Sequence, residues 1–266
     1  MNSLWENPIF LRSRRVAARA LGSGPKAWLS RYGGGLLILL GPLGCYLFFG
    51  FESVLRDPWG WPRQVLGPIL GFSAFLLVLY TVTRALNGTF SAISLEKEQK
   101  TYDSLLSTLL TSSDVVGGKL AAGLWPIVRE LLVVSPLGVA LGALAGYPLQ
   151  ALLFMGLCGC CALLFGMIGL WASYSSPTSP LANRKGTGLT AALLIGGPLV
   201  DWFLHVISYR SGADFQPVFT ALSPLAAASS ISNGSPLWMA TFLLYLGVAW
   251  GLSVHLRRLA QTARLG

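Results

Sequence analysis

The chain has 266 residues, of which 53% are hydrophobic and only 11% are charged, and its mean hydropathy is +0.62. These values exclude an ordinary soluble globular protein and predict an integral membrane protein. A spanning helix needs roughly 20 apolar residues, so the length allows about half a dozen spans and no sizeable soluble domain. We interpret the formal net charge of +9 as a sign of membrane topology and of contact with anionic lipid heads, not of nucleic-acid binding.

The N-terminal residues 3–31 interleave aromatic and aliphatic side chains with a cluster of arginines. This mixture is typical of a helix that lies flat in the membrane interface, whereas a simple positively charged flank would explain the arginines alone. The sequence GSGP at 22–25 is expected to end that helix before the first span. No cleavable signal peptide is expected, and we interpret residues 1–33 as a cytoplasmic interfacial arm.

Six apolar runs of spanning length follow, which predicts an all-α integral membrane protein with six transmembrane helices. The runs cover residues 34–51, 65–86, 120–146, 149–174, 187–208 and 237–256. The third and fourth are joined only by GYPL, so they are expected to form a helical hairpin. We interpret the whole chain, 1–266, as a single domain with a six-span part over 34–256 and a cytoplasmic tail over 257–266.

The positions of Lys and Arg indicate the orientation, because cytoplasmic loops are enriched in them. If the N-terminus is inside the cell, most of these residues fall in cytoplasmic segments. Arg56, Arg63 and Arg210 then fall on the opposite side, and Arg129 lies within a span. We therefore expect a multi-pass protein of the inner (plasma) membrane with both termini in the cytoplasm.

The segment ISLEKEQKTYDSLLSTLLTSSDVVGGK at 93–119 joins the second and third spans and is unusually rich in charge. Apolar residues at helical spacing predict a short amphipathic helix on the cytoplasmic side, followed by capping and breaking residues in SSD and GG. The apolar positions are Tyr102, Leu105, Leu106, Leu109 and Leu110. Such a helix could simply rest on the membrane. Its acidic residues are unfavourable beside an anionic leaflet, however, so a protein partner fits better.

The string LEKEQKTYDSLLSTLLTSSDVVGGKL resembles the signature of the permease subunits of type-2 ABC exporters. The matching positions are Glu96, Lys97, Glu98, Thr101, Leu105, Leu106, Thr108, Gly118 and Lys119. Lys100 replaces the usual Gly and Leu109 replaces the usual Pro, and both departures favour a continuous helix over a kinked one. The sequence ALSPLAAA at 221–228 is similar to the Leu-Ser-Pro motif before the last span of that family, so the resemblance covers nearly the whole chain.

The resemblance implies a permease subunit that works with a cytoplasmic ABC ATPase subunit and with a second permease chain, as a homodimer or a heterodimer. The segment between spans two and three would be the coupling helix: its apolar stripe would anchor it on the ATPase, and Glu96 and Glu98 would pair with basic groups there. The residues expected to couple are Glu96, Glu98, Thr101, Tyr102, Leu105, Leu106 and Leu109.

The chain is not expected to be an enzyme. SDVVGGKL ends in Gly-Lys, but Ser113 stands where a phosphate-binding loop needs its first Gly, and Leu120 stands where it needs Ser or Thr. We therefore expect no cofactor on this chain, and ATP and Mg on the partner ATPase subunit.

Four ionisable residues within the spans are candidates for function, since charge is costly in a membrane. Arg129 and Glu130 point in different directions on a helix, so they are expected to contact different neighbours, either along a translocation path or in structural ion pairs. Asp201 and His205 share one helix face near the outer end of the fifth span. They could form an outer gate, an interfacial polar cluster, or a catalytic or metal-binding pair.

The cysteines at 45, 158, 160 and 161 all lie in apolar runs and are expected to pack as small hydrophobic residues, with no metal site. Two other functions stay open from the residues alone. An intramembrane enzyme would need a nucleophile or metal centre that we do not find in the sequence. A non-transporting scaffold would recruit a soluble partner through 93–119 without moving anything.

Overall fold

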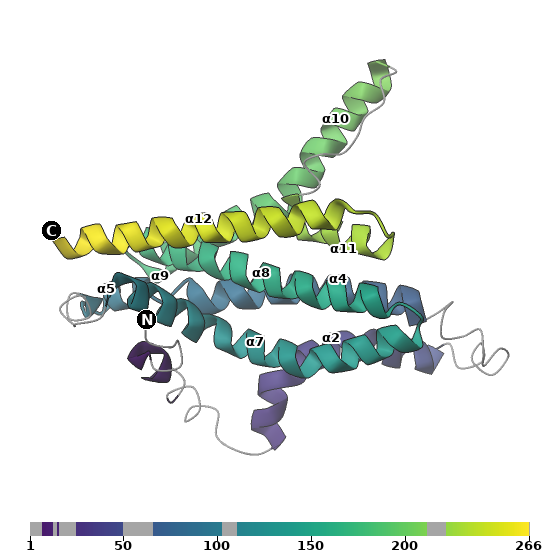
Figure 1. Ribbon diagram of the computed structural model, residues 1–266, viewed down its shortest axis with the longest axis horizontal. Helices are drawn as coiled ribbons and strands as arrows, with labels where there is room; N and C mark the ends of the chain where they lie inside the picture. The colour runs from purple at the N-terminus through teal and green to yellow at the C-terminus, as the bar shows by residue number, and fades with distance from the viewer. Residues whose placement is uncertain are drawn as a thin grey trace.

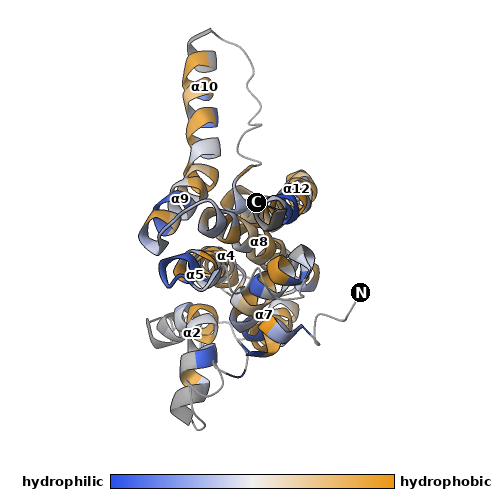
Figure 2. Ribbon diagram, turned by 90° about the vertical axis from the view of Figure 1, so that its left-hand side faces the viewer, coloured by the Kyte–Doolittle hydropathy of each residue, from blue (hydrophilic) through white to orange (hydrophobic). Residues whose placement is uncertain are grey.

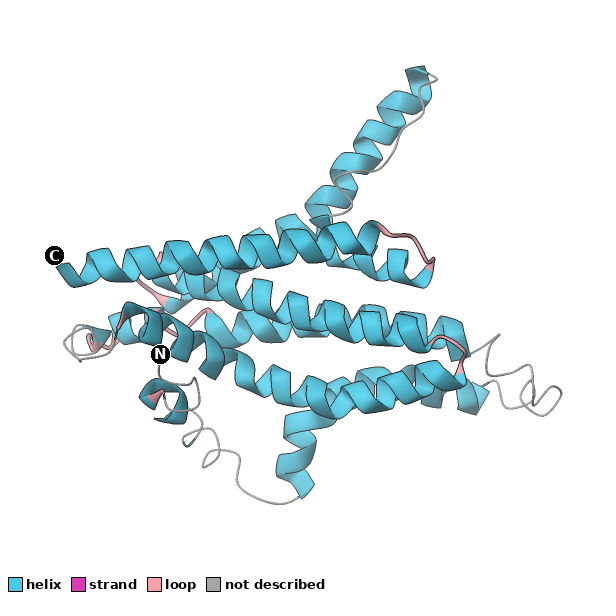
Figure 3. Ribbon diagram, viewed as in Figure 1, coloured by secondary structure: helices cyan, strands magenta, loops and turns pink. Residues whose placement is uncertain are grey.

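The computed structural model describes residues 7–12, 15, 25–49, 66–102, 111–211 and 222–265, and in these ranges the secondary structure consists of helices joined by loops and turns, without strands (Figure 3). The helices are α2 (Pro25–Phe49), α4 (Gly67–Thr89), α5 (Ser94–Glu98), α7 (Ser112–Leu144), α8 (Pro148–Tyr174), α9 (Ser179–Ala191), α10 (Gly197–Ser211), α11 (Pro224–Ser232) and α12 (Leu237–Leu265). A π-helical turn, Ala192–Gly196, joins α9 to α10. The predicted all-α fold is confirmed for the described residues.

Within the described ranges, five helices are long and apolar enough to cross a membrane. They are Gly67–Glu98, Ser113–Leu144, Pro148–Tyr174, Ser179–Ile207 and Leu237–Thr262. These helices contain most of the second to sixth predicted spans. The first predicted span falls largely in α2, which is not among the five. The molecule is thus a helical bundle whose five long apolar helices indicate a multi-pass membrane protein.

Helix α8 is the centre of the bundle, and it packs against α4, α7, α9, α11 and α12 (Figure 1). Its residues 164–170 are all buried, from Leu164 through Leu170. A helix that is apolar on every side belongs in the interior of such a bundle. The outward faces of the other helices carry large exposed apolar residues such as Leu243 and Trp250, as expected of surfaces that meet lipid.

Small residues bring α4 very close to α7 and α8. A Cβ atom on Gly123 of α7 would lie 2.5 Å from the carbonyl oxygen of Gly88 on α4, and one on Gly169 of α8 would lie 2.2 Å from the Oγ1 of Thr89. Close backbone approach through Gly is typical of helix packing in membranes. These contacts fix the end of α4 that leads into α5.

Helix α7 begins earlier than the sequence predicts. Thr111 and Asp114 form a capping box: the Asp114 N–H donates to Thr111 Oγ1 at 3.2 Å, and the Thr111 N–H donates to Asp114 Oδ2 at 3.1 Å. The predicted break at Gly117 and Gly118 is wrong, because this cap starts the helix before them and both lie inside α7. Gly118 is needed for packing, since a Cβ there would lie 2.7 Å from Asn7 Oδ1.

Helix α10 projects away from the bundle (Figures 1 and 2). It continues from α9 through the π-helical turn, a feature that often bends helices. Its apolar side chains are widely exposed: Trp202 is 65% and Phe203 60% accessible. The α9–α10 unit therefore leaves a large apolar surface uncovered by the rest of the described chain.

Candidate functional site

Helix α5 lies at one end of the bundle, the same end as the C-terminus of α12 and residues 7–12 (Figure 1). Hydrophilic residues gather on α5 and α9 at this end, as Figure 2 shows. The hydroxyl of Ser173, near the end of α8, accepts hydrogen bonds from the N–H groups of Ile93 and Ser94, both at 2.9 Å. Ser173 thus satisfies the amides at the start of α5 that no helix carbonyl can reach.

The charged residues of α5 bind the ends of three other helices. Glu96 forms an ion pair with Lys119 of α7. The Lys97 ammonium donates to the carbonyl of Tyr174, the last residue of α8, and the Glu98 carboxylate accepts from the N–H of Ser179, the first residue of α9. A cation at a helix C-terminus and an anion at a helix N-terminus both complement the helix dipole. We call these six residues the α5 junction.

A tyrosine pair extends the junction to α12. The Tyr102 hydroxyl donates to the Tyr174 hydroxyl at 2.9 Å, which donates in turn to the carbonyl of Leu259 at 3.1 Å. The Lys97 ammonium lies 5.0 Å from the centre of the Tyr174 ring and 5.7 Å from that of Tyr102, within the range of cation–π attraction. The segment after α4 is therefore bonded to α7, α8, α9 and α12.

Helix α5 ends at Glu98, and Lys100 lies in the turn after it, so the expected continuous helix through this position is wrong. Lys100 has φ 55°, the left-handed conformation that glycine adopts most easily. Its N–H bonds the Lys97 carbonyl at 3.1 Å, and the Thr101 N–H bonds the Glu96 carbonyl at 2.9 Å. This pair of hydrogen bonds is a Schellman motif. These hydrogen bonds satisfy two carbonyl groups at the end of α5. They favour the left-handed conformation here, although lysine by itself favours a helix.

The predicted amphipathic stripe is only partly described. Thr101 is exposed and Tyr102 is half-buried, while residues 103–110, with Leu105, Leu106 and Leu109, lie outside the described residues. The described residues begin again at Thr111, at the capped start of α7.

The N-terminal residues pack beside that cap. The Asn7 side-chain amide donates to the Asp114 carbonyl at 2.8 Å, and the Phe10 ring meets the Trp125 ring edge-on with centres 5.7 Å apart. Phe10 is buried. Residues 8–12 of the predicted interfacial arm are helical and are held by α7; residues 13, 14 and 16–24 of that arm lie outside the described residues.

Glu130 of α7 is almost fully buried and binds two other helices. Its Oε1 accepts from the N–H of Gly35 on α2 at 2.6 Å, and the Tyr80 hydroxyl of α4 lies 3.0 Å and 2.9 Å from its two oxygens. Arg129 instead places its guanidinium 5.2 Å from the centre of the Tyr32 ring. The two side chains contact different neighbours, as predicted.

Helix α2 is bent (Figure 1). A carboxylate that binds an N–H inside a helix competes with the regular helical hydrogen bonds, which is one cause of such bends. Glu130 does this at Gly35, where α2 passes so close that a Cβ would lie 3.1 Å from the carboxylate oxygen.

Asp201 and His205 lie on one helix, α10, but in different surroundings: Asp201 is buried and His205 is exposed. In the described part of the chain, no group of three or more His, Cys, Asp or Glu side chains could hold a metal ion. Cys158, Cys160 and Cys161 are free thiols within α8, and the side chain of Cys45 lies outside the described residues.

The residues that bind α5 were not predicted from the sequence. Ser173, Tyr174 and Ser179 carry no motif, and they lie more than 70 positions away from their partners along the chain. Only their place in the sequence could have indicated them: Ser173 and Tyr174 end the predicted span 149–174, and Ser179 begins the segment after it.

Together these features define a helical protein of the multi-pass membrane type with a polar junction at one end of its bundle. Comparison with known protein families gives no match, and no curated protein matches the chain.

Proposed function

We propose that the protein is the membrane-spanning permease subunit of an ATP-driven exporter of the type-2 ABC class. A separate cytoplasmic ATPase subunit hydrolyses ATP with Mg, and this chain moves the substrate across the membrane. The α5 junction is the observation that carries the proposal. A subunit of this kind needs one cytoplasmic segment through which the motion of a soluble partner reaches several spans.

The α5 junction supplies such a segment. Residues 103–110, which hold the expected docking stripe, directly follow Tyr102, and Tyr102 is bonded to α8 and through it to α12. Glu96 and Glu98 join the same segment to α7 and α9. A displacement imposed on 103–110 therefore acts on the ends of four helices at once. In this proposal, Glu96 and Glu98 transmit motion within the chain. The apolar stripe is the part that docks on the ATPase subunit.

The backbone at Lys100 also supports the proposal. The resembled signature has Gly at this position, and Lys100 adopts the left-handed conformation that favours Gly. The local geometry is thus compatible with the signature even though the residue differs from it.

The positions of the chain ends support six spans with both termini in the cytoplasm. Residues 7–12 and the end of α12 lie at the same end of the bundle as α5 (Figure 1), as expected for an even number of crossings. The five long apolar helices give an odd number, and α2 supplies the sixth. The predominance of Lys and Arg in the segments at the α5 end supports a cytoplasmic position for that end in an inner (plasma) membrane.

We further propose that α10 packs against a second permease chain. One chain leaves Trp202, Phe203 and Ile207 uncovered, and a helix–helix contact would cover them. Asp201, which is buried at the base of α10, and His205 would lie at this contact and could act as a gate.

The test measures ATP hydrolysis by the complex of this chain with its ATPase subunit, purified from native membranes in mild detergent. Residues 103–110 are replaced by a Gly/Ser sequence of equal length, and residues 212–219 are replaced in the same way as a control. We expect the first replacement to release the ATPase or to return its turnover to that of the isolated subunit, and the control to leave both unchanged. An ATPase that stays bound and keeps its turnover in the first variant would refute the proposal. Binding without any effect of this chain on turnover would identify a scaffold instead.

A further inference from the structure

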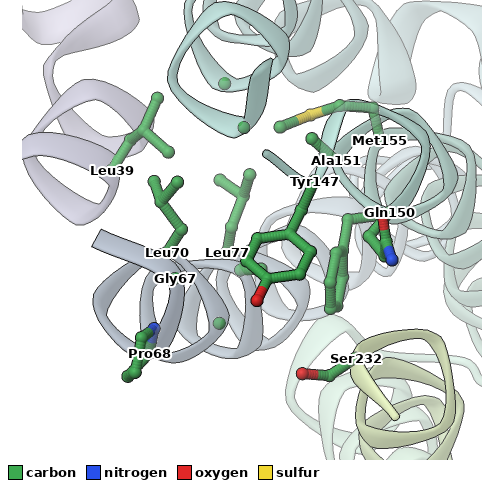
Figure 4. A pocket seen from close by; sticks show the side chains of 15 residues that line it. Leu39, Gly67, Pro68, Leu70, Leu77, Tyr147, Gln150, Ala151, Met155 and Ser232 are labelled. Atoms are coloured by element: carbon green, nitrogen blue, oxygen red, sulfur yellow. The ribbon is translucent and has the colours of Figure 1, made fainter. Parts of the chain in front are cut away.

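A cavity of about 440 Å³ lies among α2, α4, α7, α8 and α11, at the end of the bundle opposite α5 (Figures 1 and 4). Its volume falls within the range of about 300–1,000 Å³ typical of small-molecule sites. An apolar cavity of about 150 Å³ already suffices to bind benzene in another protein. The space is therefore large enough for a much bigger apolar group.

Small residues on one face of α4 create this space. Gly67, Gly71 and Ala74 recur at helical spacing and all line the cavity. The nearest heavy atom to a Cβ on Gly71 would be Ser232 Oγ, 4.0 Å away. By contrast, α8 packs directly against Gly138 and Gly142 of α7, since a Cβ on them would lie 2.5 Å from Met155 Cε and 2.4 Å from Ala151 Cβ. The free space of the cavity therefore lies beside α4, next to a tight α7–α8 contact.

The lining is mostly apolar, with a few polar side chains. In Figure 4, Leu39, Leu70 and Leu77 lie on one side of the cavity, Gln150 and Ser232 lie on the other, and Tyr147 lies between them. The polar lining side chains are the amide of Gln150 and the hydroxyls of Ser232 and Tyr147, and none of the described lining residues is charged. These groups recognise a neutral hydrogen-bonding end group, such as a hydroxyl or an ester, and provide no counter-ion for an anion.

A second cavity of about 220 Å³ adjoins the first. Gly71, Phe154 and Ser232 line both cavities, and the second also contacts Leu225 and Ala228 of α11. Its polar lining residues, Ser229 and Asn233, are again neutral. A flexible chain that bends at Gly71 would occupy both parts, whereas a compact ring would occupy one.

We propose that this cavity binds a single hydrocarbon chain that carries a neutral polar end group, as in a monoacylglycerol or a fatty alcohol. The chain lies against the leucines and Phe154, and the end group bonds Gln150, Tyr147 and Ser232. The site is independent of the coupling role proposed for α5, from which it is separated by the length of the bundle.

The test uses the full-length protein in phosphatidylcholine nanodiscs and a monoacylglycerol with a photoactivatable diazirine in its acyl chain. We expect labelling on the cavity-lining parts of α4 and α8, and competition by excess unlabelled monoacylglycerol. Gly71→Leu adds a side chain whose Cβ has room, with Ser232 Oγ 4.0 Å away, and whose outer atoms extend into the cavity. It should lower labelling about tenfold, the scale expected when about two buried methylene groups are displaced. Ser232→Leu fills it from α11 and should act in the same direction.

The matched control is Gly159→Leu, the same substitution at a position of α8 where a Cβ would meet nothing within 4 Å. It should change labelling by less than about twofold, and all variants should elute and melt like the parent. Labelling that is spread over the lipid-facing surfaces, or that Gly71→Leu and Ser232→Leu lower no more than Gly159→Leu does, would overturn the proposal.

Discussion

At the scale of single residues, the α5 junction depends on charges that are partly withdrawn from water. The side chains of Lys119 and Glu96 are only 15% and 21% exposed, so their ion pair is worth more than a surface pair, which contributes about 0–1 kcal/mol. Removing one partner leaves the other charge partly buried and unpaired. Lys97 and Glu98 gain similarly from the helix ends that they bind.

A charge-reversal cycle tests the ion pair. Glu96→Lys and Lys119→Glu should each lower the free energy of unfolding by about 1–3 kcal/mol, between the surface and fully buried cases. The double reversal restores opposite charges and should recover more than half of the loss. Melting in detergent measures the stability, and ATPase turnover measures coupling. If the double variant stays as impaired as the single ones, Glu96 acts on a group other than Lys119.

Lys100 offers a test of the end of α5. Lys100→Gly should stabilise the protein by about 1 kcal/mol, because Gly adopts the left-handed conformation without the Cβ penalty. Lys100→Ala removes the same charge but keeps the Cβ, so it should give no such gain. The melting temperatures of the two variants provide the comparison, and equal shifts would contradict the role assigned to the backbone at this position.

At the scale of helices, close packing and buried hydrogen bonds hold α4 and α7 together at both ends of their contact. Gly88 and Gly123 allow the backbones to touch near α5, and Tyr80 binds Glu130 further along. Glu130 also ties α7 to α2 through Gly35. The relative positions of these three helices are therefore fixed by a few residues.

Two Gly→Ala substitutions on α7 should have opposite effects. Gly123→Ala places a Cβ 2.5 Å from a backbone oxygen of α4, so it should destabilise the protein by about 1–3 kcal/mol. Gly117→Ala meets nothing within 4 Å and should stabilise α7 by about 0.5–1 kcal/mol through helix propensity. Melting of the two variants side by side gives the comparison. If both variants were less stable than the parent, the distance from α4 would not explain the effect of adding a Cβ to α7.

Glu130 can be tested with two substitutions that differ in one property. Glu130→Ala leaves the Gly35 N–H and the Tyr80 hydroxyl without their acceptor, at a cost of roughly 1–3 kcal/mol each. Glu130→Gln keeps an acceptor oxygen and should cost less. Melting in detergent gives the ranking. If Glu130→Ala abolished transport while leaving stability intact, Glu130 would belong to the translocation path and not to the contact of α2 with α7.

At the scale of the whole molecule, apolar run length predicted the helices well, because a membrane span requires a long run whatever its neighbours are. Five of the six predicted runs fall on helices of spanning length. The relative arrangement could not be predicted in the same way. The central position of α8 and the hydrogen bond between Glu130 and Gly35 of α2 join distant parts of the chain, and the projection of α10 follows from the π-helical turn before it.

The candidate site was predictable only in part, for a similar reason. The charge of 93–119 marked this segment as a candidate, and Arg129 and Glu130 contact different neighbours, as expected. The partners of Glu96 and Glu98 within the chain could not be foreseen, since Lys119 and Ser179 lie on other helices. Lys100 was misjudged because residue propensity favoured a helix, while the Schellman hydrogen bonds required a left-handed residue.

The most direct test of the proposed coupling role is site-specific photo-cross-linking in native membranes. A photoreactive amino acid is placed at Leu106, on the expected docking stripe, and as a control at Leu243, an exposed position of α12. The proposal predicts that Leu106 forms an adduct with a soluble ATP-hydrolysing subunit and that Leu243 does not. An ATPase that copurifies with the chain but forms no adduct from Leu105, Leu106 or Leu109 would contradict it.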